Sequence, residues 1–214
     1  MIITALNKQK YRQRVNVYVD GRFALALGLA VAQEAGLHTG MAVSDDDLHA
    51  LQDADARQSA YDAALRLLAY RPRSEKELRL RLARRGYAPR LVDETLARLR
   101  RLGYVDDEAF ARFWTESRDS SSPRSQRLLR SELVQKGVEA DTASEAVAAL
   151  SDEEAAYRAA SKRLRTVQED DYVAFRRRLG DFLLRRGFSY DVIRRTVDRC
   201  WAEKGGSPAD GSEA

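Results

Sequence analysis

One segment occurs three times in this chain, at 78–99, 129–150 and 179–200. Each copy carries a glycine at the same place, and these glycines (Gly86, Gly137 and Gly187) lie 51 and 50 residues apart. Apolar residues lie eight and four positions before each glycine, and six, ten and thirteen positions after it. This spacing gives one apolar face to a helix before the glycine and another to a helix after it. In chain order these apolar residues are Leu78, Leu82, Val92, Leu96 and Leu99; Leu129, Leu133, Ala143, Val147 and Leu150; and Leu179, Leu183, Ile193, Val197 and Cys200.

A fixed period of about 50 residues predicts a chain built by repeating one helical unit. We expect a mainly α fold with three tandem three-helix repeats, at 56–105, 106–150 and 151–204. Residues 1–55 differ in pattern and form a separate N-terminal region. Residues 205–214 are Gly, Ser, Pro, Ala and acids, a composition that predicts a disordered tail. In such an array, function is expected on an extended surface rather than in a pocket.

Local signals mark the ends of the predicted helices. Arg71-Pro72-Arg73 ends the first helix of repeat one, because proline lacks a backbone donor and disfavours helix at the preceding residue. Ser74 with Glu77 is a capping box that begins the second helix, and Gly86 ends that helix in a left-handed conformation. Similar signals begin the later repeats, at Asp106 and at Ser151 with Glu154, and a loop is expected near 166–171.

The N-terminal region predicts a β-hairpin followed by short helices. Residues 14–27 alternate apolar and polar side chains around Asp20-Gly21, a strong turn signal. Two registers stay open: a two-residue turn pairs Val17 with Ala24, and a three-residue loop pairs Val19 with Phe23. A short helix is expected at 27–36 and another from Ser44, with Asp47 completing a capping box.

Composition excludes several classes of protein. Cys200 is the only cysteine, so an intramolecular disulfide is impossible, in agreement with a reducing cytoplasm. The sequence has no apolar run of 18 residues and no signal-peptide pattern, so we expect a cytoplasmic protein without a membrane partner. We also expect a monomer. Cys200 occupies an apolar repeat position, which favours a core residue over a nucleophile.

The sequence offers little for catalysis. His38 and His49 have no ligand-type neighbours at metal spacing, and the glycines between 86 and 187 are interpreted as helix stops or junctions rather than a phosphate-binding loop. Asp106 and Asp107 are compatible with acid/base work or metal binding, but acids at a helix start are favoured by the helix dipole and supply the cap. We therefore expect no enzyme, no cofactor and no metal.

Charge is unevenly distributed. Residues 60–105 hold 12 Lys and Arg against 5 Asp and Glu, a net charge of +7, whereas 106–150 carry −3 and 151–204 carry +3. This asymmetry indicates a polyanion or an acidic protein surface as partner. The alternative is a solvated helix face with local pairs, for example Glu94 with Arg98.

Repeat one supplies the candidate partner-binding residues, because its arginines fall mostly outside the apolar stripes. Arginine binds phosphate and carboxylate alike, so the residue type leaves the anion open. Tyr70, Tyr87 and Tyr104 near the junctions either stack on bases or, as we favour, pack repeats together. A second basic cluster lies at Arg176, Arg177 and Arg178. The candidate residues are Arg71, Arg73, Arg79, Arg81, Arg84, Arg85, Arg98 and Arg101.

Three segments resemble the RecX family of recombinase regulators: RPRSEKELRLRLARRGY at 71–87, LGYVDDEAFARFW at 102–114 and LLRSELVQKGV at 128–138. The resemblance covers roughly 56–200, and VNVYVDGRF resembles the N-terminal extension of longer members. It implies an elongated, curved array of three-helix repeats without catalytic activity. It also implies a partner, the RecA filament on single-stranded DNA, whose ATP hydrolysis, strand exchange and co-protease activity are inhibited. The chain departs from the family pattern at 119–127, where DSSSPRSQR replaces a Pro-Arg-Gly-like lead into the helix.

Two functions therefore stand side by side. The first is a non-enzymatic modulator bound to the RecA filament. The alternative is a protein that binds single- or double-stranded DNA directly, with its repeats acting as helix-turn-helix-like modules. Steep salt dependence on naked DNA would favour the alternative, and the lack of an Asn/Gln/Arg cluster at one helix N-terminus argues against sequence readout.

Overall fold

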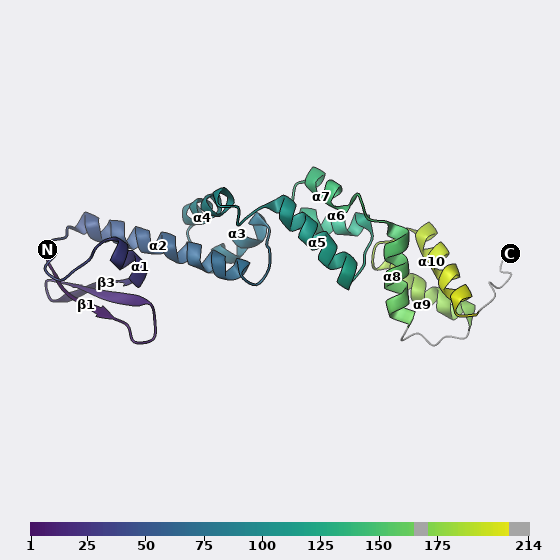
Figure 1. Ribbon diagram of the computed structural model, residues 1–214, viewed down its shortest axis with the longest axis horizontal. Helices are drawn as coiled ribbons and strands as arrows, with labels where there is room; N and C mark the ends of the chain where they lie inside the picture. The colour runs from purple at the N-terminus through teal and green to yellow at the C-terminus, as the bar shows by residue number, and fades with distance from the viewer. Residues whose placement is uncertain (165–170, 206–214) are drawn as a thin grey trace. The chain divides into compact units, whose positions relative to one another are not determined.

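The computed structural model describes residues 1–164 and 171–205, which form the strands and helices of Figure 1. The chain divides into two compact units, Met1–Val105 and Asp106–Ala214. The first unit holds β1 (Ile3–Lys8), β2 (Arg14–Val19), β3 (Arg22–Gly28), α1 (Leu29–Glu34), α2 (Asp45–Leu68), α3 (Glu75–Ala83) and α4 (Pro89–Arg101). The second holds α5 (Asp107–Ser121), α6 (Gln126–Gln135), α7 (Ala140–Val147), α8 (Asp152–Leu164), α9 (Tyr172–Leu184) and α10 (Tyr190–Glu203).

The N-terminal region is a three-stranded antiparallel sheet of order β1-β2-β3 rather than the expected hairpin. Strand β1 pairs with β2 along 3–8 and was not predicted. Its pattern is weak because only Ile3 is fully buried, so the alternation that marks a half-buried strand is missing.

The β2–β3 turn has two residues, Asp20 and Gly21, the shorter of the two lengths left open, and both are left-handed with φ of 48° and 78°. Tyr18 therefore lies opposite Phe23. A bulge follows, so Val17 pairs with Leu25 and not with Ala24. Neither of the two predicted pairings is therefore found. The turn has the shorter of the two lengths, but the extra residue of the bulge shifts the pairing of the strands beyond it.

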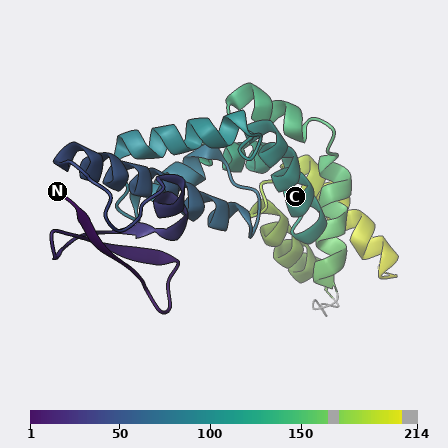
Figure 2. The same cartoon turned by 60° about the vertical axis from the view of Figure 1, so that its left-hand side comes forward.

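The sheet packs against α1 and the N-terminal half of α2, as Figures 1 and 2 both show. Apolar side chains of β2 and β3 form its core with Ile3 and Val43. Asp55 of α2 ties the sheet to the helix, because its carboxylate accepts a hydrogen bond from the Gly28 backbone N–H at 2.6 Å and pairs with Arg14 at 2.8 Å. The helix thus holds the end of β3 as well as the first repeat.

Helix α2 is continuous through the boundary expected at 55/56. It begins at the predicted capping box, in which Ser44 and Asp47 each bond the other's backbone. Its C-terminal half packs with α3 and α4 around a core that includes Ala64, Leu78 and Leu96. One helix therefore serves both the sheet and the first repeat.

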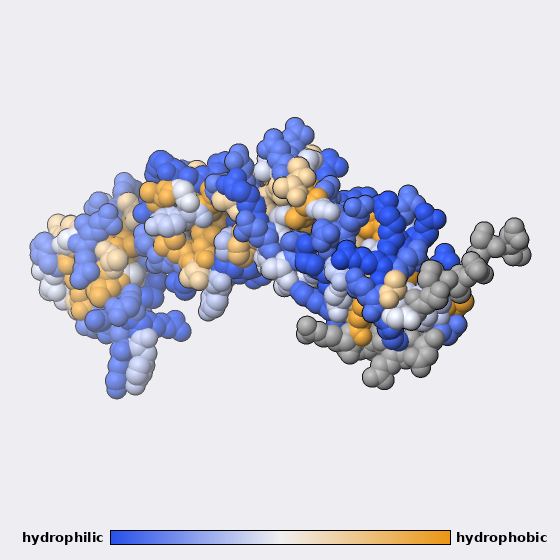
Figure 3. Space-filling view, turned by 45° about the vertical axis from the view of Figure 1, so that its right-hand side comes forward, coloured by the Kyte–Doolittle hydropathy of each residue, from blue (hydrophilic) through white to orange (hydrophobic). Residues whose placement is uncertain are grey.

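Each repeat buries the apolar positions that the sequence predicts. Repeats two and three have separate cores, built on α5–α7 and α8–α10. Fourteen of the fifteen recurring apolar residues are buried, and Leu150 is half-buried. Hydrophilic residues cover much of the visible face of the helical repeats (Figure 3). The predicted α fold of three three-helix repeats is confirmed.

The recurring glycines end the second helix of each repeat, as expected. Gly86, Gly137 and Gly187 have φ of 85°, 95° and 85°, in the left-handed region that favours glycine. Gly180 differs, because it lies inside α9 with an ordinary helical backbone, so the interpretation of every glycine between 86 and 187 as a stop or junction is wrong there. The expected tail lies outside the described residues except for Gly205, as does most of the loop expected near 166–171.

Candidate partner-binding surface

The eight candidate arginines lie on the α2–α3 loop, on α3 and the turn after it, and on α4. Leu78 and Leu82 are fully buried, which directs the intervening residues of α3 outward. Val92, Leu96 and Leu99 do the same for α4. Placement on these elements follows from the apolar spacing, but the surroundings of each guanidinium differ.

Arg71 and Arg73 support the α2–α3 loop. Arg71 donates two hydrogen bonds to the Glu77 carboxylate, at 2.9 and 3.1 Å. Arg73 is only 8% exposed, and its Nε donates to the Leu67 carbonyl at 2.9 Å, near the end of α2. Burial lowers the pKa of the Arg73 guanidinium, and the positive charges of Arg71 and Arg81 lower it further. Arg73 therefore contributes to the loop's structure before any partner is considered.

Arg79 and Arg98 join helices of repeat one. Arg79 on α3 donates to Asp93 on α4 and pairs with Glu75 at 3.1 Å. The hydrogen bond to Asp93 is the main reason that the pKa of Arg79 is raised. The Arg98 guanidinium lies over the Tyr61 ring, 3.9 Å from its centre. Glu94, the partner suggested for Arg98, pairs instead with Arg90 at 2.9 Å.

Arg81, Arg84, Arg85 and Arg101 are exposed and have no ion-pair or hydrogen-bond partner within 1–164 and 171–205. We call these four residues the basic surface. Each charge is already solvated, so an anion need not break an internal pair to reach it. The local-pair interpretation holds for Arg71 and Arg79, whereas the basic surface retains unneutralised charge.

The three tyrosines differ from one another. The Tyr87 hydroxyl donates to the Ser59 carbonyl at 3.1 Å and its ring packs on the core of repeat one. Tyr70 is 86% exposed and Tyr104 is 57% exposed. Tyr87 therefore packs within repeat one rather than between repeats, and the exposure of Tyr70 does not fit the packing interpretation.

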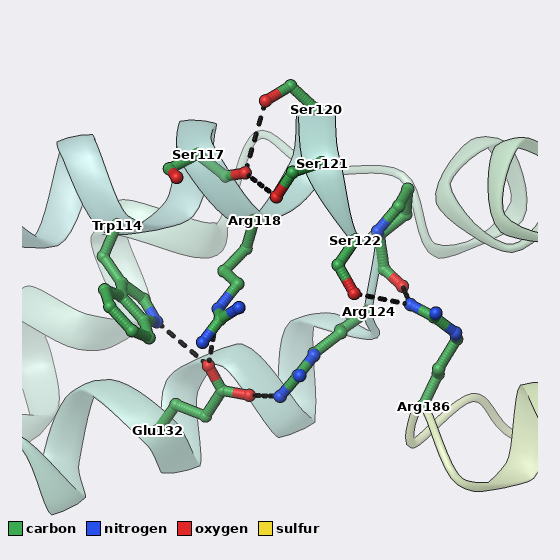
Figure 4. A network of polar contacts seen from close by, with 10 residues as sticks. Trp114, Ser117, Arg118, Ser120, Ser121, Ser122, Arg124, Glu132 and Arg186 are labelled. Atoms are coloured by element: carbon green, nitrogen blue, oxygen red, sulfur yellow. Dashed lines mark hydrogen bonds and ion pairs between the residues drawn. The ribbon is translucent and has the colours of Figure 1, made fainter.

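A polar cluster that the sequence did not predict joins repeats two and three (Figure 4). The Glu132 carboxylate on α6 accepts a hydrogen bond from Trp114 Nε1 at 3.0 Å and forms ion pairs with Arg118 and Arg124. Arg186 of repeat three donates to Ser122 Oγ and to the Pro123 carbonyl, both at 2.9 Å. Burial lowers the pKa of Arg124, and the charges of Arg118 and Arg186 add to that effect.

More bonds cross the same junction. In repeat three, Arg158 forms an ion pair with Asp119 of repeat two. Lys162 Nζ donates a hydrogen bond to the Ser120 carbonyl at 2.6 Å. In the opposite direction, the Ser125 N–H donates to the Arg186 carbonyl at 3.0 Å. Cations at the C-terminal end of α5 are also favoured by its helix dipole. We call this contact the polar joint, and on the side of repeat two it is made by the segment 119–127.

Models of one protein family match most of the chain. Residues 1–44 match the RecX N-terminal domain, and 60–99, 106–147 and 151–197 match the first, second and third RecX three-helix domains. The chain belongs to the RecX family. It is therefore one of a family of regulatory proteins. The three matched ranges of the helical part fall on α2–α4, α5–α7 and α8–α10, the three repeats of the structure.

Several regulatory proteins RecX are similar to the chain. That of Geobacillus kaustophilus is 33% identical over 198 residues, covering 89% of this chain and 73% of the relative. That of Bacillus subtilis is 28% identical and covers 92% and 76%. That of Chlorobium phaeobacteroides is 36% identical over 149 residues, covering 70% of this chain and 97% of the relative.

Solved RecX structures also match. The crystal structure of a regulatory protein RecX covers 92% of this chain and 98% of its own, with a TM-score of 0.65 and 25% identity. RecX from Lactobacillus salivarius gives a TM-score of 0.57 at 25% identity, covering 68% and 97%.

Other residues considered for chemistry have structural roles in this RecX protein. The Asp106 carboxylate accepts hydrogen bonds from the backbone N–H groups of Glu108 and Ala109, and so caps α5 as predicted. Cys200 is fully buried, and burial raises the pKa of its thiol to about 11. The described part of the chain holds no group of three or more His, Cys, Asp or Glu able to bind a metal. Over the same residues, no helix is long and apolar enough to cross a bilayer.

Proposed function

We propose that this chain is a non-enzymatic regulator that binds the RecA filament on single-stranded DNA. In this proposal it lowers ATP hydrolysis, strand exchange and co-protease activity. Membership of the RecX family supports a regulatory role of this kind. The observation that carries the contact is the basic surface, because a filament containing DNA and acidic protein presents the opposite charge.

The basic surface sets the order of importance among the arginines. Arg81, Arg84, Arg85 and Arg101 keep their charge available to a partner. Arg71, Arg79 and Arg98 already contact internal groups, so their contribution to binding is smaller. Arg73 acts indirectly, by holding the loop before α3.

The direct test measures ATP hydrolysis by RecA on single-stranded DNA while purified protein is added. The rate should fall as the protein approaches stoichiometric amounts. An unchanged rate at excess protein would remove the inhibitory part of the proposal.

Charge reversal locates the contact. Arg81→Glu, Arg84→Glu and Arg85→Glu together should weaken filament binding by about tenfold or more, since several charge contacts become repulsive. The matched control reverses Lys8, Lys10 and Arg12, which are exposed on β1 and the following loop and give the same change in net charge. Binding is compared by fluorescence anisotropy, with circular dichroism to confirm helicity. Equal losses in the two triple variants would mean that net charge, and not this surface, governs binding.

The direct DNA-binding alternative is separated by salt. Affinity for naked single- and double-stranded DNA is measured over a series of salt concentrations without recombinase. Each neutralised phosphate adds to the slope. Weak naked-DNA binding beside tight filament binding supports the proposal, whereas equal affinity for both supports the alternative.

A further inference from the structure

The second and third helices of repeats one and two are joined by an arginine that repeat three lacks. The relevant positions lie seven residues before and seven residues after the recurring glycine. In repeat one these are Arg79 and Asp93, which form an ion pair. In repeat two they are Arg130 and Ser144, joined by a 2.8 Å hydrogen bond from Arg130 Nε. In both repeats a long side chain from the second helix therefore spans the surface between the two helices.

Repeat three replaces that arginine by Gly180 and places Arg194 on the opposite helix. Arg194 is exposed and has no hydrogen-bond or ion-pair partner in the described ranges. The surface between α9 and α10 is left open at this point as a cleft of about 320 Å³. Leu184, Ile193 and Val197 line it with Gly180.

The backbone does not require glycine at 180. Its φ lies outside the left-handed region, and a Cβ there would meet Ile193 Cγ2 at 3.7 Å, an ordinary contact. Glycine inside a helix weakens the helix relative to alanine. Glycine therefore weakens the helix here without a conformational reason, and it lies in the lining of the cleft, where a larger side chain would take up space.

The rim of the cleft carries both signs of charge. Three arginines and three aspartates line it: Arg176, Arg177, Arg194, Asp181, Asp191 and Asp198. A nucleic acid backbone is bound by a surface of net positive charge, which this rim does not present. At about 320 Å³ the cleft is at the small end of ligand pockets, which span roughly 300 to 1,000 Å³. An apolar floor of this size suits one large side chain of a protein partner.

We propose that the cleft between α9 and α10 docks a protein segment that inserts one large apolar side chain over Gly180 and pairs a neighbouring carboxylate with Arg194. The inserted group takes the place of the arginine that covers the same position in repeats one and two. Because the third helix offers an acid in repeat one and an arginine in repeat three, the incoming group must be acidic. The proposal does not rest on the RecA filament.

The test uses the full chain and fluorescein-labelled nine-residue peptides. Each peptide has Leu, Phe or Ala at its centre, flanked by Glu, Lys or Ser. Peptides with Leu or Phe between glutamates should bind at least about tenfold more tightly than those with Ala or with flanking lysines. Preference for lysine or serine flanks, or no binding of any peptide up to about 1 mM, would overturn the proposal.

Three variants test the location. Gly180→Leu fills the cleft while favouring the helix, and should reduce affinity at least about tenfold. Gly180→Arg with Arg194→Asp rebuilds the pair of repeat one and should have the same effect. Arg194→Glu alone should reverse the preference from glutamate-flanked to lysine-flanked peptides. Thermal melts confirm that each variant is folded.

Unchanged peptide affinity in folded Gly180→Leu would place binding elsewhere and overturn the proposal. A single-stranded oligonucleotide is added as competitor in every assay. If it binds the unmodified chain and loses binding in Gly180→Leu, the cleft is a nucleic-acid site and the protein-segment proposal fails. No recombinase is present, so failure here leaves the proposed filament function untouched.

Discussion

Gly86 and Gly187 end equivalent helices with the same backbone conformation but have different surroundings. A Cβ built on Gly86 meets no atom within 4 Å. A Cβ built on Gly187 meets Ser125 Oγ at 2.6 Å and Leu128 Cβ at 2.8 Å, both in repeat two. In repeat one glycine is required by φ alone, whereas in repeat three it is required by φ and by the close approach of a neighbouring repeat.

The comparison shows that the same helix-ending signal has acquired a second role at the polar joint. Repeats two and three keep separate apolar cores and are held together by side chains and backbone groups around 119–127. Hydrogen bonds of this kind are directional, so they define a particular contact rather than a general apolar association. The absence of side-chain bulk at Gly187 is one condition for that contact.

The largest effect is expected when alanine replaces the two glycines. Gly86→Ala should lower the free energy of unfolding by about 1–2 kcal/mol, the cost of a left-handed non-glycine residue. Gly187→Ala should cause the same backbone strain and also crowd the side chains at the start of α6, which adds roughly 1–3 kcal/mol to the loss of unfolding free energy. Urea denaturation followed by circular dichroism measures both. Similar losses in the two variants would mean that the polar joint is not formed in solution.

The residue before each glycine gives a second, smaller contrast. Arg186→Ala removes two hydrogen bonds and leaves the buried Pro123 carbonyl without that donor, so we expect a loss of about 2 kcal/mol. Arg85→Ala, at the equivalent exposed position, should change stability by less than about 0.5 kcal/mol. The same denaturation experiment compares them. A loss in Arg85→Ala as large as that in Arg186→Ala would show that the position matters for the repeat itself and not for the joint.

At neutral pH the smallest effect on stability concerns Cys200, which occupies the core position that Leu99 holds in repeat one. With a thiol pKa of about 11 in the folded chain against 9.0 for an ordinary thiol, stability is unaffected below pH 9 and falls as pH rises from 9 to 11. At pH 8 the folded thiol should alkylate about a hundredfold more slowly than in urea, because the thiolate fraction differs by that factor. Iodoacetamide labelling followed by mass spectrometry measures the rates. Equal rates would contradict the burial of Cys200.

The repeat pattern predicted the helices and their buried faces because apolar spacing reports directly on one face of a helix. Leu78, Leu129 and Leu179 are fully buried, as that spacing requires. The outward contacts were not predictable in the same way. Arg186 and Ser122 are 64 residues apart in the sequence, and nothing in either segment marks the other as its partner.

The candidate site was predicted as a set of arginines but not as a surface. Arginines at outward positions look alike in a sequence, and only their neighbours separate Arg73, which is buried, from Arg81, which is exposed and unpaired within the described chain. The cleft at Gly180 was missed for a related reason. Its meaning depends on comparing three pairs of positions across two helices, and in repeat three the first position of the pair is a glycine, which has no side chain to contact the second.

The polar joint also bears on how members of this family exchange segments. A crossover between relatives after residue 150 would join one protein's 119–127 loop to the residues that another protein has at 158, 162 and 186. A residue other than arginine at 186 would remove the side-chain donor of the Pro123 carbonyl. A crossover at 105/106 keeps both sides of the joint from the same parent. Chimaeras should therefore tolerate the earlier junction better, and repeats two and three should be inherited as a pair.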